Sequence, residues 1–509
     1  MPDNFVVSQS IDGKVQLTWD YKPYDIDGFT VSYKPQDATE YTPLESVDIE
    51  QRAYTVNQEL EIGKSYYFAV TAKSGKASSY PATRLYRILR DDELTGVRIL
   101  RTLNSHAGIA VEYQAQNLPK EETENIGIRL SDSPDVTASN EVITIPAPAN
   151  RRGKNTCMQV VPITRLPKDK STLYIRAYAQ GKTGDAKYSE PVEIKLAEQP
   201  KEIKLEWQDV TPESLKGKVE IYKTESKLNG RPFNAWYAVG NPAKSRIKRN
   251  DPQHNTPLSV QASAVNKALV LVNAAYFYGQ TTLGLYGHGG LKGSDGRHRG
   301  SLRKGHPEYE TMHLASRGFF GVTKAGEAIV CWAGTSQKDH KPHLYNHPMP
   351  ILLGEALYAD YLPEIVGKPV DFNPYYGVSA GPVVLKDGRV PVDFETFRDG
   401  QEYYVGNYEI IPYDIFGKTT YPDRTAVGVL EDGRIVLFVC DGRIPISKGA
   451  NLIELAQIMK GIGCKDALNL DGGGSTNMWA AGSIINHKDI DPKTGDTRAI
   501  RSIIGFFDK

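Results

Sequence analysis

Cysteine is scarce in this chain: Cys157, Cys331, Cys440 and Cys464 are the only four among 509 residues. None of them has the close pairing of a zinc site, and so few cysteines cannot form a dense disulfide framework. Cys440 and Cys464 have apolar neighbours in the sequence, so we expect free, buried thiols. Cysteine content therefore excludes a disulfide-stapled scaffold and leaves the compartment undecided.

The chain also lacks an excess of charge of either sign. Lys and Arg number 61, Asp and Glu number 61, and the formal net charge is zero. This balance removes any global electrostatic reason to bind nucleic acid or an anionic membrane. No apolar run approaches the ~18 residues that span a bilayer. No signal-like segment follows Met1, so we expect a mature or trimmed end from which an export signal was removed.

The length predicts two to four domains, because 509 residues exceed one ordinary hydrophobic core. Within residues 1–90, short segments alternate apolar and polar residues, as strands with one buried face do. Trp19 and the segment leading to Tyr66 resemble a fibronectin type III module. In that family the tryptophan fills the core and the tyrosine locks a loop corner. Residues 91–198 are similar but more divergent, and we expect a second β-sandwich there.

The sequence pattern changes after the linker at residues 197–201. Residues 450–460 place apolar side chains at the three-four spacing of a helix face, and Gly461 and Gly463 follow as stop signals. Residues 467–470 then form a short strand pattern. Mixed helices and strands predict one α+β domain over residues 199–509, with a mixed sheet and flanking helices.

The strongest local feature is a strand that ends in a carboxylate and three glycines, at residues 467–477. Glycines let the backbone approach a ligand and expose its N–H groups as donors. Asp471 at the strand end is held by the sheet rather than by a loop tip. A glycine-rich turn with a capping aspartate is the alternative for this motif taken alone.

A predicted hairpin lies upstream, with strands on either side of the turn at residues 431–433. Arg424 opens it, and Asp441 and Arg443 close it, so both arginines are predicted at one sheet end. Two guanidinium groups suit a phosphodiester, because each matches two phosphate oxygens. A surface salt bridge is the alternative for each single arginine.

These segments, with residues 273–277 and 379–388, occur in the order of the phosphodiester glycosidase family, which the chain resembles over residues 200–509. The resemblance implies hydrolysis of a sugar C1–O bond in a substrate similar to an N-acetylglucosamine-1-phosphodiester. It implies catalytic roles for Asp471, Asp441, Arg424 and Arg443. It implies substrate contacts from Asn273, Ser379, Gly381, Gly472, Gly473, Gly474, Ser475, Thr476 and Arg498.

The chain departs from the family pattern in two places. Tyr276 and Phe277 stand where members often have a small residue and two phenylalanines. Residues 280–350 are unfamiliar, and seven of the ten histidines fall between His288 and His347. Asp339, His340, His343 and His347 have a spacing that could wrap an ion, but solvated loop histidines are favoured. No cofactor is predicted, and a divalent cation on Asp441 or Asp471 stays open.

Two other functions compete with the glycosidase prediction. A metal-dependent phosphodiesterase would cut the P–O bond and release a sugar phosphate. A non-catalytic glycan-binding surface protein would use an aromatic platform, for which the candidates are Trp207, Trp236, Trp332 and Trp479, although tryptophans lie more often in cores. Fibronectin-like modules before a glycosidase domain usually act as spacers, so we expect a periplasmic or cell-surface protein. The expected partner is a glycan or sugar phosphodiester, and the oligomeric state stays open.

Overall fold

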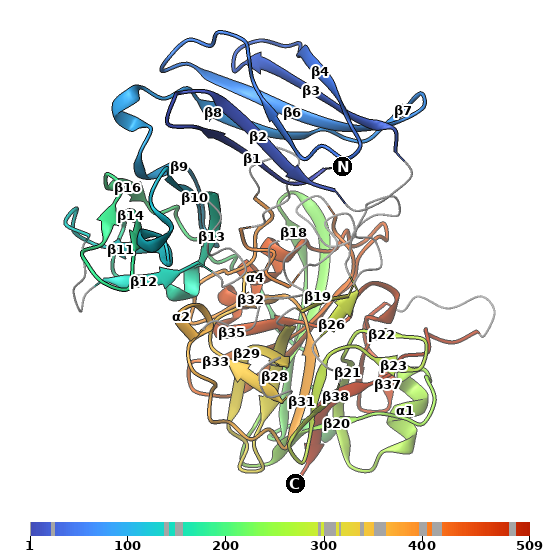
Figure 1. Cartoon of the computed structure of the whole chain (residues 1–509). Coiled ribbons are helices and arrows are strands. Elements are labelled where there is room, and N and C mark those ends of the chain that lie inside the picture. The colour runs from blue at the N-terminus through green and yellow to red at the C-terminus, as the bar shows by residue number, and fades with distance from the viewer. Residues whose placement is uncertain are drawn as a thin grey trace.

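The structure is a computed structural model of the whole chain. It describes residues 2–21, 26–136, 142–147, 156–293, 297–299, 312–314, 317–335, 341–350, 363–395, 405–409, 420–487 and 495–509. Figure 1 shows an N-terminal sandwich in dark blue, a second sandwich in lighter blue and teal, and a larger C-terminal domain. A search of the described residues finds no helix long and apolar enough to cross a membrane.

The first sandwich packs two antiparallel sheets around Trp19, which is 2% exposed. The hydroxyl of Tyr66 accepts a hydrogen bond from the Glu61 backbone N–H at 3.2 Å, which confirms the predicted loop-corner tyrosine. One sheet contains β1 (Asp3–Gln9), β2 (Val15–Asp20) and β5 (Ala53–Thr55). The other contains β4 (Thr42–Asp48), β3 (Gly28–Pro35), β6 (Ser65–Ser74), β7 (Ala77–Ser78) and β8 (Ala82–Arg87).

The second sandwich also has two sheets, and its core includes residues of the C-terminal domain. Tyr345, Met349, Ile365 and Val366 belong to the same buried cluster as the sandwich interior. One sheet contains β13 (Thr156–Pro162), β10 (Gly108–Gln116) and β9 (Gly96–Ser105). The other contains β12 (Ile143–Pro146), β11 (Asn125–Ser131), β14 (Thr172–Gln180), β15 (Lys187–Tyr188) and β16 (Val192–Lys195). The two parts are therefore packed together rather than separated by solvent.

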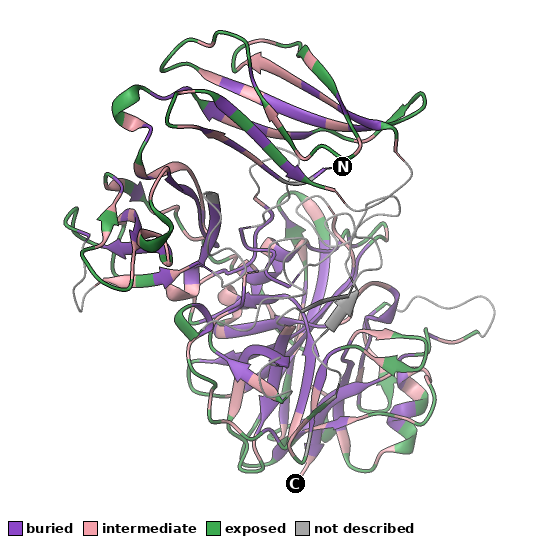
Figure 2. Cartoon of the chain, viewed as in Figure 1, coloured by how far each residue is buried: buried purple, intermediate pink, exposed green. Residues whose placement is uncertain are grey.

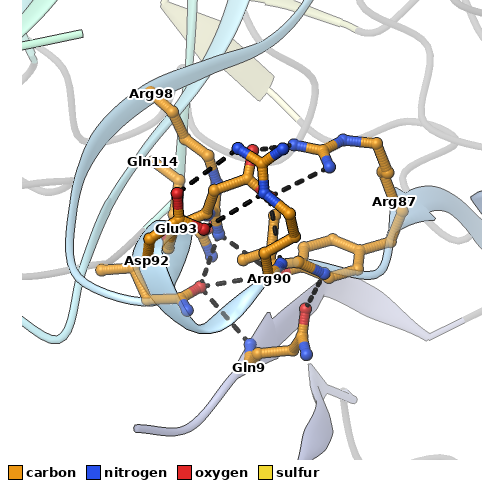
Figure 3. Close-up of polar contacts among 10 residues, drawn as sticks. Gln9, Arg87, Arg90, Asp92, Glu93, Arg98 and Gln114 are labelled. Atoms are coloured by element: carbon orange, nitrogen blue, oxygen red, sulfur yellow. Dashed lines mark hydrogen bonds and ion pairs between the residues drawn. The ribbon is translucent and has the colours of Figure 1, made fainter. Parts of the chain in front are cut away.

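A polar network joins the two sandwiches (Figure 3). Arg98 of β9 donates to the Tyr86 hydroxyl at 3.1 Å and to the Gln116 side-chain oxygen at 2.8 Å. Gln9 of β1 donates its backbone N–H to Gln116 at 3.3 Å, and its side-chain oxygen accepts from the Leu89 N–H at 2.6 Å. Buried polar groups with several specific partners fix one geometry, because a different angle would leave them unpaired. The joint is thus specified by side chains as well as by the connecting chain.

Three larger antiparallel sheets form the C-terminal domain, and Figure 2 shows their strands as largely buried. The seven-stranded sheet has the order β17 (Gln208–Asp209), β18 (Val219–Leu228), β19 (Arg231–Gly240), β34 (Ile435–Cys440), β33 (Arg424–Leu430), β35 (Cys464–Asn469), β32 (Val383–Leu385). The five-stranded sheet contains β20 (Ser245–Asn250), β38 (Ile503–Asp508), β21 (Ala268–Asn273), β36 (Met478–Ala480) and β37 (Ser483–Ile484). The six-stranded sheet contains β25 (Leu291–Gly293), β24 (Leu285–His288), β31 (Tyr376–Ala380), β28 (Arg317–Val322), β29 (Ala328–Thr335) and β30 (Pro342–Tyr345). Two short ribbons pair β22 (Phe277–Tyr278) with β23 (Thr281–Thr282), and β26 (Arg297–Arg299) with β27 (Met312–Leu314).

The domain is mostly β. The prediction of a mixed sheet needs correction, because among the described residues the strand pairs in the three sheets are antiparallel. The reason is connectivity: neighbouring strands such as β33 and β34 are joined by hairpins, whereas parallel neighbours need long crossovers. The described α-helices are α1 (Leu258–Ala264), α2 (Pro363–Val366) and α4 (Leu452–Ile462). Cys440 and Cys464 are buried free thiols as predicted, and Cys157 and Cys331 are buried too.

The helix predicted over residues 450–460 is confirmed as α4. Asn451 caps its first turn by accepting from the Glu454 N–H at 2.8 Å, and the Glu454 carboxylate accepts from the Asn451 N–H at 3.1 Å. Gly463, with φ 101°, ends the helix in a left-handed conformation. The helix runs through Gly461, where a side chain would collide with the Ile203 carbonyl. α4 packs against β32 and β35 and covers one face of the seven-stranded sheet.

Candidate active site

The glycine motif lies where three parts of the C-terminal domain meet. Asp471 follows β35, and its backbone N–H donates to the Ala274 carbonyl, just beyond β21, at 2.9 Å. The Gly473 N–H donates to the Asp423 carbonyl, just before β33, also at 2.9 Å. A single 3₁₀ turn, η6 (Gly473–Ser475), follows, and Gly473 has a φ of 60°, which favours glycine. The motif is therefore held from both sides by backbone hydrogen bonds.

Asp471 is a carboxylic acid with a strongly perturbed environment at the edge of this turn. Asp471 is partly exposed, and its Oδ1 accepts a hydrogen bond from the Gly472 N–H at 3.0 Å. Burial raises the pKa of Asp471 to about 6, although the Ser475 hydroxyl, the Gly472 N–H and the charge of Arg498 oppose the rise. A reachable carboxyl that titrates near neutral pH is a feature of catalytic sites.

Two guanidinium groups flank the glycine turn. A Cβ placed on Gly473 would lie 3.5 Å from Arg443 Nη2, and one on Gly474 would lie 2.7 Å from Arg498 Nη2. The Arg443 side chain is 53% exposed, and Arg498 is exposed. A side chain at residue 474 would have to displace the end of the Arg498 side chain. Positive charge therefore gathers beside the turn, within reach of solvent.

Arg424 and Arg443 lie at one sheet end, as predicted, because Arg424 is opposite Cys440 in the ladder. Their surroundings differ, however. Arg424 is 0% exposed, and its Nε donates to the Ala450 carbonyl at 2.9 Å. Burial lowers the pKa of Arg424 to about 10. The surface pair at the glycine turn is thus Arg443 with Arg498, and Arg424 lies beneath it.

Asp423, which the sequence reasoning missed, holds Arg443 in place. Its Oδ2 accepts from both Nε and Nη2 of Arg443 at 2.8 Å, and its Oδ1 accepts from the Gly442 N–H at 2.9 Å. The same residue's carbonyl accepts from Gly473. Burial raises the pKa of the Asp423 carboxyl, and Arg443 acts against that rise. Asp423 therefore fixes the arginine relative to the turn.

We expect Asp423→Asn to weaken binding of the phosphodiester that the sequence resemblance implies, more than it slows turnover. The amide carries no negative charge, and both Arg443 contacts go to the single oxygen Oδ2, so the charge-assisted hold on Arg443 would weaken. KM should rise by about tenfold, consistent with a loss on the order of 1.4 kcal/mol. Steady-state kinetics measures this change. Asp432→Asn is the matched control, because Asp432 makes a similar pair with Arg434 on an exposed turn, at 2.7 Å. An unchanged KM in Asp423→Asn would contradict this prediction.

Asn273 and Thr476 lie behind the motif. Asn273 is 1% exposed; its amide donates to the Asp471 carbonyl at 2.5 Å, and its oxygen accepts from the Thr425 hydroxyl at 2.7 Å. Thr476 is 4% exposed, and its hydroxyl lies 3.3 Å from that of Thr425. These groups brace the glycine turn against β21 and β33. Asn273 thus makes contacts within the protein, and its contact with a sugar stays a prediction.

Asp441 is fully buried and faces a loop that the sequence reasoning did not single out. Its Oδ2 lies 2.8 Å from Nδ1 of His487, and its Oδ1 accepts from the Asn486 amide at 3.2 Å. Burial raises the pKa of Asp441, and the contacts of His487 and Asn486 oppose the rise. The His487 side chain is 52% exposed. Asp441 thus orients a partly exposed imidazole instead of reaching solvent itself.

Gly381 and Tyr276 connect the six-stranded sheet to the glycine motif. The Gly381 carbonyl accepts from the Tyr276 hydroxyl at 2.6 Å and from the Asn469 amide at 2.7 Å. Burial raises the pKa of Tyr276, and the charge of Asp471 raises it further. Ser379 is 1% exposed in β31, so its hydroxyl lies inside the fold.

The histidine-rich region does not form a metal centre in the part of it that the structure describes. No group of three or more His, Cys, Asp or Glu side chains suited to a metal occurs among the described residues. Asp339 and His340 lie outside them. Burial lowers the pKa of His347 to about 4, which keeps that imidazole neutral near pH 7. The tryptophans named as a platform pack into or against hydrophobic clusters: Trp207, Trp236, Trp332 and Trp479.

The span that carries these side chains matches a known family. Residues 266–507 fit the family model described as phosphodiester glycosidase, and residues 1–85 fit that of the fibronectin type III domain. Residues 266–507 are therefore similar to the phosphodiester glycosidase family. All the predicted site residues, from Asn273 to Arg498, lie within this matched span.

Similar proteins include an N-acetylglucosamine-1-phosphodiester alpha-N-acetylglucosaminidase from Mus musculus. It is 38% identical over 64 residues, which are 13% of this chain and 12% of the mouse protein. The catalytic domain of the zebrafish protein of that name, auto-inhibited by its pro-peptide, has a TM-score of 0.38 and 19% identity, covering 60% of this chain and 89% of that one. A hypothetical protein from Synechocystis has a TM-score of 0.36 and 15% identity, covering 100% of this chain and 99% of that one.

Proposed function

We propose that the phosphodiester glycosidase domain hydrolyses the C1–O bond of a sugar-1-phosphodiester, with an N-acetylglucosamine-like sugar as the glycosyl group. The products are the free sugar and a phosphomonoester. The observation that carries the proposal is the glycine turn itself. It places a carboxyl whose pKa is about 6 next to a turn flanked by two guanidinium groups that reach solvent.

The phosphate is assigned to Arg443 and Arg498. Guanidinium groups recognise phosphate oxygens in pairs, and they strengthen their hold as negative charge develops on the leaving group. Arg443 is fixed by Asp423, and the Arg498 guanidinium lies directly beside Gly474. Arg424 is assigned to supporting the site from below, because its side chain is fully buried.

Asp471 is assigned to the sugar side of the scissile bond. As a carboxylate it stabilises the positive charge that develops at C1 in an oxocarbenium-like transition state. The leaving phosphomonoester is already a good leaving group, so a strong general acid is less necessary than in ordinary glycosidases. Asp471 then acts either as the nucleophile or as the base that activates water. The anomeric form of the released sugar distinguishes the two, because a covalent intermediate retains configuration.

The test is turnover of a panel of sugar-1-phosphodiesters with identification of the products. Free sugar with a phosphomonoester supports the proposal, whereas a sugar phosphate with free alcohol would assign the chain to P–O phosphodiesterases. Saturable glycan binding without turnover would make it a binding protein. Hydrolysis in H₂¹⁸O sharpens the result: the label enters the sugar when C1–O breaks and the phosphate when P–O breaks.

We also propose that the protein works outside the cytoplasm, with the fibronectin-like sandwiches as its N-terminal part. Support comes from the combination of fibronectin type III and glycosidase domains in one chain. Fractionation of the native host, with detection of the intact chain, tests this setting.

A further inference from the structure

The second sandwich contacts the C-terminal domain through the short segment 405–409. Val405 and Tyr408 are 0% and 3% exposed, and they share a buried cluster with Ala110, Met158 and Val160 of β10 and β13. Figure 1 shows these two strands on the side of the sandwich that faces the C-terminal domain. The segment is thus packed against the sandwich rather than only against its own domain.

One hydrogen bond anchors this segment to the sandwich backbone. The Tyr408 hydroxyl donates to the Ala107 carbonyl at 2.8 Å. It lies so close to the chain that a Cβ on Gly108 would come within 2.6 Å of it. Since the ring is buried as well, the sandwich determines where Tyr408, and the residue after it, can lie.

The next residue, Glu409, enters the interior of the C-terminal domain. Its carboxylate is 2% exposed and accepts from three strands: the Gly318 N–H of β28 at 2.8 Å, the Val383 N–H of β32 at 2.8 Å and the Trp332 indole N–H of β29 at 3.0 Å. A buried carboxylate with three donors ties those strands together, because each donor would otherwise be left unpaired. Glu409 therefore links the six-stranded and seven-stranded sheets.

Glu409 also lies directly against the chain that supports the candidate site. A Cβ on Gly381 would be 2.0 Å from its Oε2. The Gly381 carbonyl in turn accepts from Tyr276 and from Asn469, and Asn469 lies two residues before Asp471. The electrostatic neighbours of Tyr276 include both Asp471 and Glu409. A short path of contacts thus connects the Tyr408 anchor to the catalytic carboxyl.

We propose that Glu409 is a positioning residue for the glycosidase site and that the second sandwich holds it in place through Tyr408. The sandwich is then part of the catalytic unit instead of a spacer. The inference uses the proposed function for its kinetic readout but has a structural readout that is independent of it.

The decisive variants are Tyr408→Phe and Tyr113→Phe in the full-length chain. Each removes one buried tyrosine hydroxyl; that of Tyr113 donates to Gln159 within the second sandwich at 2.9 Å. Hydrogen–deuterium exchange over residues 376–385 should accelerate at least threefold in Tyr408→Phe and stay unchanged in Tyr113→Phe. Equal exchange in the two variants would overturn the proposed link, whether or not the protein is a glycosidase.

Kinetics on a substrate that the wild type hydrolyses gives the second readout. Tyr408→Phe should lower kcat by about three- to tenfold with KM nearly unchanged, because the phosphate contacts of Arg443 and Arg498 remain. Glu409→Gln should lower kcat further, since the NH₂ group of the new amide would face a backbone N–H that now donates to the carboxylate. Inhibition by inorganic phosphate should be unaltered in both variants. A KM effect alone, or losses equal to those of Tyr113→Phe, would make these residues purely structural. If the wild type turns over no diester, the proposed function fails and the exchange result still decides the positioning role.

Discussion

Asp471→Asn is expected to lower kcat by roughly 10²–10⁴-fold while the protein remains folded. The substitution keeps the size of the side chain and an oxygen that can accept the Gly472 N–H, which lies 3.0 Å from Oδ1. It removes the charge that would stabilise developing positive charge at C1. The measurement is single-turnover kinetics on an active sugar-1-phosphodiester.

Asp466→Asn provides the matched control for this variant. Asp466 lies five residues upstream in β35, is 5% exposed, and has its carboxylate 3.6 Å from Lys386. Its substitution should lower stability and leave kcat of the folded enzyme within about twofold, because the carboxylate serves the fold. Comparable kcat losses in both variants would remove Asp471 from the mechanism.

The raised pKa of Asp471 gives two further expectations with a defined sign. Because the carboxylate is the active form, kcat/KM should rise with pH through about 6, and this limb should disappear in Asp471→Asn. The stability of the fold depends on pH in the opposite direction. A pKa raised above its usual value near 4 means that ionisation opposes folding, so stability falls as pH rises from about 4 to about 6. Asp471→Asn should therefore have a higher Tm than wild type at pH 7.5, but not at pH 4.

Arg443→Lys and Arg498→Lys are expected to lose about 10- to 100-fold in kcat/KM on an alkyl phosphodiester. Lysine keeps the positive charge but cannot present two parallel N–H groups to phosphate. The loss should be much smaller on the same sugar with an activated non-phosphate leaving group. Both substrates are assayed with one enzyme preparation, so misfolding would reduce the two activities alike.

Arg434→Lys is the control for these arginine variants, because Arg434 is a partly exposed side chain paired with Asp432 in the same hairpin. It should behave as wild type on both substrates. Arg424→Lys should chiefly lower stability, since the guanidinium is fully buried and donates to the Ala450 carbonyl. Equal losses on the two substrates in folded Arg443→Lys and Arg498→Lys would place the phosphate elsewhere.

The separate roles of Arg424 and Arg443 illustrate the limit of reasoning from pattern. Their common sheet end follows from the hairpin, whose turn and pairing are local in sequence. The difference in exposure between Arg424 and Arg443 does not follow from the hairpin, because β33 and β34 are buried at every position. Val427 and Ala426 belong to clusters on opposite faces of that sheet. A strand covered on both faces has no alternation of apolar and polar residues from which the direction of Arg424 could be inferred.

The sequence by itself determined the sandwich with Trp19 and Tyr66, helix α4 with its glycine stop, and the glycine turn after Asp471. Each of these was predicted from a short sequence pattern of its own, in which spacing and residue type are enough. Only the tertiary structure decided that Arg498 packs on Gly474, that Asp423 holds Arg443, that His487 meets Asp441, and that Glu409 ties three strands together. These contacts join segments from 20 to 91 residues apart. Their cause is the folded arrangement of buried strands, in which each polar group must find a partner wherever the packing brings one.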